Sequence, residues 1–172
     1  MSYIVVDCES DGPVPPIYSM ICFGAVIVNE KLNKTFYGKT HPISDTYNPE
    51  TLAISVFSRK DHESFDNPVK VMEEFDIWIK ENSIGNPIFI SDNPAYDWQW
   101  INYYFHKYLG RNPFGYSARR IGDLYCGMVK DVYAKWKHFR DAPHNHDPVS
   151  DALGNAQALL KMKDMGLNIK IN

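Results

Sequence analysis

The stretch YIVVDCESDG, from Tyr3 to Gly12, joins a run of β-branched residues to a group of carboxylates. The apolar part is typical of a buried central strand that ends where the acidic residues begin. Because side chains alternate along a strand, Asp7 and Glu9 should lie on the same face. Two neighbouring carboxylates repel each other, and a divalent cation such as Mg2+ relieves that repulsion. A solvated turn also collects Asp residues, so this pair alone does not decide the function.

Further elements follow along the chain. Strands are expected at residues 20–28, 34–39 and 87–91. Helices are expected at residues 49–55, 67–82 and about 120–133, and from Pro148 to Met165. Another helix is expected from Asp97 onward, with Trp98, Ile101, Phe105 and Tyr108 on one side. The helix at 67–82 should bury Val69, Met72, Phe75 and Ile79. Hairpin strands followed by strand–helix alternation predict an α/β fold, with a mixed β-sheet flanked by helices.

Length and composition narrow the class of protein. The chain has 172 residues, which suits a single domain over 1–172. Its 18 Lys+Arg and 21 Asp+Glu give a net charge of -3, so binding to nucleic acid would need a local basic patch. The three cysteines are widely spaced, no secretion signal opens the chain and the longest apolar run is short. These features predict a cytoplasmic protein with no membrane association.

Two more acidic elements come later in the chain. Asp97 follows the strand PIFIS at the start of a helix, where it is either a helix N-cap or a site carboxylate at the carboxyl edge of the sheet. In HNHDPVSDA, Asp147 and Pro148 should begin a helix, which places Asp151 in its first turn and His146 in the preceding loop. A histidine with a near-neutral pKa there is suited to accept a proton from water.

Taken together and in this order, these motifs resemble the DEDDh family of 3′-to-5′ exonucleases. The first family motif is matched by DCESDG (Asp7 to Gly12) and the following strand by ICFGAV, the second by Asn93 and Asp97, and the third by His146, Asp151 and Ala152. The resemblance implies a ribonuclease H-like fold. The chain departs from the family pattern at two places. Pro148 stands where the family often has alanine, and SDN replaces the small residues or histidine that frequently lead into the second motif. Both lie beside matched residues, so they affect substrate handling more than chemistry.

The resemblance also implies a mechanism. Asp7 would bridge two Mg2+ ions, for which Mn2+ is expected to substitute. Glu9 and Asp151 would complete the first ion site, Asp97 would hold the second, and His146 would be the general base. The finer similarity to small bacterial and phage exoribonucleases implies single-stranded RNA as the substrate in preference to DNA. Nucleoside 5′-monophosphates would be released from a free 3′ hydroxyl by a homodimer.

Other interpretations stay open. The chain is alternatively a 3′-to-5′ exodeoxyribonuclease, or a nucleic-acid-binding relic without catalysis. Cys126, His138, His144 and His146 match no common zinc-finger spacing, and His144 is interpreted as a loop residue. The family layout places Met20 where it would wedge against the terminal base. Eight basic residues between Lys107 and Arg140 either guide a phosphate backbone or form a solvated helix face.

Overall fold

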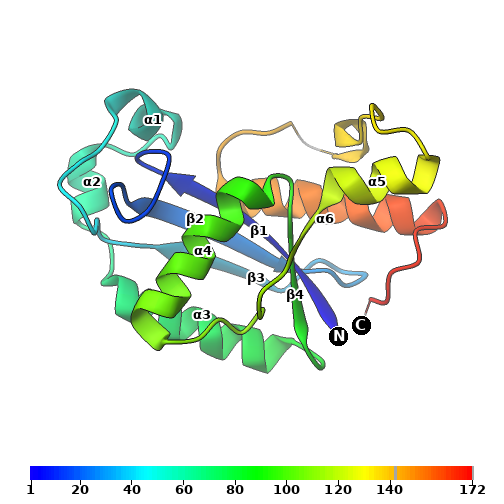
Figure 1. Cartoon of the computed structure of the whole chain (residues 1–172), viewed down its shortest axis with the longest axis horizontal. Coiled ribbons are helices and arrows are strands. Elements are labelled where there is room, and N and C mark those ends of the chain that lie inside the picture. Colours follow the sequence, from blue (N-terminus) through cyan, green and yellow to red (C-terminus); the bar gives the residue numbers. More distant parts are fainter. Residues whose placement is uncertain (142, 172) are drawn as a thin grey trace.

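The structure is a computed structural model that describes residues 1–141 and 143–171. Within them, one sheet has the strand order β3-β2-β1-β4-β5 (Figure 1). The strands are β1 (Ser2–Ser10), β2 (Met20–Ile27), β3 (Thr35–Lys39), β4 (Pro87–Ser91) and β5 (Ala118–Arg120). β1, β2 and β3 pair in antiparallel fashion, whereas β4 lies parallel to both β1 and β5. The predicted mixed sheet is therefore confirmed.

Helices cover both faces of this sheet (Figure 1). They are α1 (Pro49–Ile54), α2 (Arg59–Glu63), α3 (Pro68–Asn82), α4 (Pro94–Leu109), α5 (Ile121–Val129) and α6 (Pro148–Asp164), with a 3-10 turn, η1, at Lys137–Phe139. α3 and α4 pack on one face, and α6 packs on the other. In the described part of the chain, no helix has the length and apolar character needed to cross a membrane.

The alternation of β1 decides which face receives the acidic pair. Ile4 and Val6 pack into the cluster formed with α3 and α4, whereas Tyr3 and Val5 pack against α6. Asp7 and Glu9 have the same parity as Tyr3 and Val5, so both carboxylates point toward the α6 side. The expectation from the sequence that they share one face agrees with this packing.

Gly24 lets α6 approach the sheet at this point. It is the partner of Asp7 in the β1–β2 register. A Cβ atom at Gly24 would lie 2.3 Å from the backbone of Pro148 and 2.4 Å from that of Val149. Only glycine leaves room for the first turn of α6 to lie directly on β2. The glycine of ICFGAV thus places the start of α6 beside Asp7.

Three details differ from the expectations. The helix expected over about 120–133 is present but shorter: it runs from Ile121 to Val129 and ends where Lys130 takes a left-handed conformation with φ 58°, and the residues before it form the short edge strand β5. In α3, Val69 is 38% exposed and Val71 is buried in its place, because the buried stripe of this helix begins one residue earlier, at Pro68. Met20 is fully buried in the core, so it is not available to contact a base.

Candidate active site

Three of the four carboxylates expected from the sequence line one pocket, and the fourth, Asp151, lies beside two of them. Asp7 and Glu9 come from the end of β1, and Asp151 comes from the first turn of α6. One oxygen from each of these three residues lies within 4.8 Å of the others. Asp97, from the first turn of α4, lies outside this group but lines the same pocket as Asp7 and Glu9. Elements separated by more than a hundred residues thus converge at one edge of the sheet.

Asp97 is not the N-cap of its helix, so that interpretation was wrong. α4 begins at Pro94, with Asn93 in the cap position. Asp97 lies one turn further along, where its backbone N–H donates to the Asn93 carbonyl at 3.0 Å. Its Oδ1 accepts a hydrogen bond from the backbone N–H of Cys8 at 3.1 Å. This bond fixes the buried carboxylate of α4 against β1.

Asp151 is held by a buried arginine that sequence reasoning did not single out. Arg140 Nη2 lies 2.5 Å from Asp151 Oδ1, and the two side chains are 5% and 0% exposed. The backbone N–H groups of Asn145 and His146 also donate to Asp151, at 3.3 and 2.9 Å. The guanidinium lies over Gly154, where a Cβ atom would come within 2.9 Å of Arg140 Nε. In the sequence, Arg140 is only one member of a basic stretch, so no local signal marks it.

Replacing Arg140 with methionine should lower the free energy of unfolding by about 3 kcal/mol or more, because it leaves Asp151 buried without its counter-ion. Methionine keeps most of the apolar stem. Chemical denaturation with urea measures the effect. Lys70→Met is the matched control, since Lys70 pairs with Asp66 at 3.1 Å on an exposed helix face and its removal should cost less than about 1 kcal/mol. Equal losses in the two variants would contradict the role given to Arg140.

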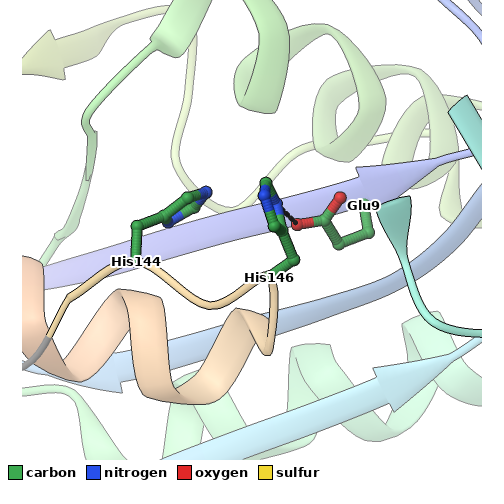
Figure 2. A group of neighbouring side chains, drawn as sticks. All are labelled: Glu9, His144 and His146. Atoms are coloured by element: carbon green, nitrogen blue, oxygen red, sulfur yellow. Dashed lines mark ion pairs between the residues drawn. The ribbon is translucent and has the colours of Figure 1, made fainter. Parts of the chain in front are cut away.

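Two histidines from the loop before α6 reach the acidic group (Figure 2). His146 Nδ1 lies 3.4 Å from Glu9 Oε1, and His144 Nδ1 lies 2.7 Å from Asp151 Oδ2. His146 has a φ of 60°, a left-handed conformation that costs a non-glycine residue about 1 kcal/mol or more. The bond from its N–H to Asp151 stabilises this turn, which aims the ring at Glu9. His144, expected to be only a loop residue, is therefore part of the site.

The pKa values of three carboxylates in this site are raised, because burial disfavours their charged forms. Burial, reinforced by the charges of Asp97, Asp151 and Glu9, raises the pKa of Asp7 well above its ordinary value. Burial raises the pKa of Asp97 to about 7. Burial also raises the pKa of Glu9 to about 7, although His146 opposes the shift. A divalent cation would offset the cost of ionising these groups.

The raised pKa values of these carboxylates predict how the stability of the protein depends on pH. An acid whose pKa is higher in the folded state binds more protons there, so stability falls as pH rises from its unfolded to its folded pKa. For Asp97 and Glu9 that interval runs from about 4 to about 7. The melting temperature of the metal-free protein should therefore fall relative to that of the Mg2+-saturated protein as pH rises through it. Thermal unfolding by circular dichroism, with chelator and with excess Mg2+, measures the difference.

Comparing the melting temperatures with and without Mg2+ removes a contribution from His62 that opposes the effect of the carboxylates on stability. Burial lowers the pKa of His62 to about 4, and this favours folding as pH rises through the same interval. That contribution is common to both samples and cancels in their difference. Asp97→Asn should reduce the pH dependence of the difference. A pH-independent difference in the unchanged protein would contradict the account of the carboxylates.

The pocket has a volume of about 270 Å3, near the lower limit of ligand cavities. Thr51 and Ile54 of α1 form part of its wall, together with Tyr96 of α4. Sequence reasoning did not assign α1 to the site, because nothing in PETLAIS distinguishes a pocket wall from an ordinary surface helix.

The donor set fits a hard divalent cation. Asp7, Glu9 and Asp151 offer only carboxylate oxygens within a short distance of one another, and Asp97 adds a fourth carboxylate nearby. Mg2+ and Mn2+ prefer such ligands. In the described residues, neither cluster of candidate metal ligands includes Cys126 or His138, so the four-residue zinc site considered from the sequence is not formed.

Comparisons with known proteins agree with this geometry. No model of a protein family matches the chain. The chain is 34% identical over 170 residues to the 3′-5′ DNA exonuclease Cap18 of Escherichia coli, with 90% of this chain and 88% of that protein covered.

Solved structures show the same fold. One is the nuclease domain of 3′hExo, a DEDDh family member bound to rAMP, with a TM-score of 0.78, 18% identity, and coverage of 99% of this chain and 96% of that one. Another is the zinc-bound complex of E. coli ExoI with single-stranded DNA, with a TM-score of 0.73, 15% identity, and coverage of 96% of this chain and 41% of that one. The predicted ribonuclease H-like fold is confirmed.

Proposed function

The chain belongs to the DEDDh family of 3′-to-5′ exonucleases, and from this premise we propose that it shortens single-stranded DNA from a free 3′ hydroxyl with Mg2+. The observation that carries the proposal is that Asp151 lies within 4.8 Å of Asp7 and Glu9, at the pocket that Asp7, Glu9 and His146 line. Phosphodiester hydrolysis needs neutralisation of phosphate charge and a group that accepts a proton from water. This pocket offers residues for both tasks.

The roles of the side chains follow from their positions. Two divalent ions held by Asp7, Glu9, Asp97 and Asp151 would neutralise the phosphate and stabilise the leaving 3′ oxygen. His146 accepts the proton of the attacking water, and Glu9 orients its ring through the 3.4 Å contact. Arg140 positions Asp151 from within the protein and does not touch the substrate, because its side chain is only 5% exposed.

The preference for single strands rests on the shape of the site. Asp7 and Glu9 are buried at the end of β1, in a pocket whose wall includes residues of α1 and of the loop before α6. A terminal nucleotide separated from its neighbours fits the pocket of about 270 Å3. A base-paired end is too wide to reach the same carboxylates. Products are nucleoside 5′-monophosphates, released one at a time.

Two sources of support bear on whether the substrate is DNA or RNA. The sequence motifs favoured RNA through a similarity to small exoribonucleases, and this stays a prediction. The 34% identical relative is named a DNA exonuclease, which supports DNA. The structural neighbours include one bound to rAMP and one bound to single-stranded DNA, so the fold supports either substrate. We give more weight to the relative, because it is 34% identical in sequence to this chain, whereas the two structural neighbours are 18% and 15% identical.

The test is a direct competition. Single strands of one sequence, made as RNA and as DNA and labelled at the 5′ end, are digested with Mg2+ and in parallel with Mn2+. Faster loss of the DNA strand supports the proposal. Faster loss of the RNA strand would establish the exoribonuclease instead and leave the family chemistry intact. If a folded, metal-loaded protein digests neither strand, the catalytically silent relic is the better account.

Two finer expectations go with this function. The homodimer implied by the family resemblance is checked by light scattering at tens of micromolar protein, where a monomer would reject it.

A cytoplasmic location agrees with the three cysteines, which are all unpaired thiols in the structure.

A further inference from the structure

The loop before α6, here called the histidine loop, brings His144 and His146 close to Glu9 of β1 (Figure 2). One ligand atom from each of Glu9, His144 and His146 lies within 4.8 Å of the others. The two rings meet edge to face, with an interplanar angle of 72° and centroids 4.3 Å apart. Both histidine side chains are 43% exposed, so an ion has access to them from solvent.

This group differs in chemistry from the carboxylate group beside it. Asp7, Glu9 and Asp151 offer oxygen alone, which suits Mg2+. The histidine group offers two imidazole nitrogens and one oxygen, a set typical of Zn2+ and other borderline cations. Three protein ligands with one open position are common at zinc sites exposed to solvent. Glu9 belongs to both groups, so the two sets compete for it.

The contact between His144 and Asp151 gives a second, independent indication of a ligand. Asp151 Oδ2 lies 2.7 Å from His144 Nδ1, so the carboxylate accepts the proton on that nitrogen. The opposite ring nitrogen then carries a free lone pair. Metal-binding histidines in proteins are oriented and made more basic by just such a carboxylate behind the ring. Asp151 is itself fixed by Arg140 at 2.5 Å, so this support is rigid.

We propose that Glu9, His144 and His146 form a binding site for a borderline divalent cation of the Zn2+ type, and that its occupancy inhibits the exonuclease. The ion occupies the lone pair of His146 and one carboxylate oxygen of Glu9. His146 is then no longer able to accept a proton, and Glu9 is withdrawn from the carboxylate group. The inhibition rests on the proposed function, whereas the binding site does not.

Binding is tested on the metal-free full chain without nucleic acid or Mg2+. All proteins carry Cys126→Ser, because the Cys126 thiol is partly exposed and would bind Zn2+ by itself. Titration calorimetry with zinc chloride compares this parent with His144→Asn. Asparagine retains an N–H donor for Asp151 but has no second ring nitrogen. We expect its affinity for Zn2+ to fall at least about tenfold.

The matched control is His138→Asn, since His138 is an exposed histidine outside both groups of candidate ligands. It should bind Zn2+ like the parent. Cobalt(II) is a second probe: its visible absorption should appear in the parent and be lost in His144→Asn. Equal Zn2+ affinity in the parent and His144→Asn would overturn the site, because binding would then belong to the carboxylates alone. Equal weakening in both histidine variants would overturn it as well.

Inhibition is tested separately with excess Mg2+ and a labelled single strand. His144→Asn should need at least about tenfold more Zn2+ than the parent for half inhibition. An unchanged requirement would overturn the inhibitory role. Failure of the proposed function has a different signature: the parent then digests no strand in Mg2+ alone, while the calorimetric difference between parent and His144→Asn persists.

Discussion

Asp7→Asn should lose at least about 10³-fold of the exonuclease rate in Mg2+ and remain folded. The substitution removes the carboxylate at the centre of the acidic group. Burial and three neighbouring acids oppose the negative charge of this carboxylate and so raise the pKa of Asp7. A metal ion held at a phosphoryl-transfer site lowers the barrier by several kcal/mol, and each 1.4 kcal/mol is a factor of ten in rate. Single-turnover digestion of a labelled strand measures the loss.

Stability separates this result from simple unfolding. Because the buried charge of Asp7 is unfavourable without metal, Asp7→Asn should raise the melting temperature of the metal-free protein. Asp45→Asn, an exposed aspartate outside the pocket, should change neither rate nor stability appreciably. A folded Asp7→Asn protein with near-normal activity would show that the metal ligands are assigned wrongly.

Asp7 is a sharper test than Asp151. From the sequence, we expect replacement of any of the four carboxylates to abolish hydrolysis while the fold survives. The structure changes the second half of that expectation for Asp151, because its removal leaves Arg140 buried with an uncompensated charge. An inactive Asp151 variant would therefore not distinguish chemistry from folding.

His146→Asn should lower the rate constant of hydrolysis by about 10² to 10⁴, with little change in Mg2+ affinity, as expected for a general base that does not bind the catalytic ions. Asparagine is chosen because it tolerates the left-handed backbone at φ 60°, so the turn that holds the N–H against Asp151 is retained. Rate constants from digestion and Mg2+ affinities from calorimetry measure the two effects.

His144→Asn gives the internal comparison. Its effect on the rate in Mg2+ should be much smaller, because the amide keeps the contact with Asp151 and His146 remains in place. If His144→Asn costs more activity than His146→Asn, the base is His144 and the alignment of the third motif is wrong.

The acidic site was predictable because its positions follow from local rules. Alternation along a buried strand places Asp7 and Glu9 on one face, and Asp147 followed by Pro148 begins a helix whose first turn contains Asp151. The order of the motifs then indicated which elements meet. These features depend on a few neighbouring residues, so the sequence carries them directly.

The parts that were missed depend on contacts between distant segments. Arg140 becomes important only because Gly154 leaves space for its guanidinium beside Asp151. The edge strand β5 consists of ARR, whose charged residues resemble the start of an exposed helix and pair only because β4 lies alongside. In the sequence only His146 has the spacing of the third motif, and the carboxylate partner of His144 was missed because the turn at His146 is what gives each histidine its own partner.

The polarity of digestion tests the central claim most directly. A single DNA strand labelled at its 5′ end is incubated with the protein and Mg2+, and products are resolved at single-nucleotide resolution. The account predicts a ladder of labelled fragments that shorten by one nucleotide at a time, no early labelled mononucleotide, and no ladder with Asp7→Asn. Immediate release of the labelled 5′ nucleotide, or cleavage at internal positions, would contradict it.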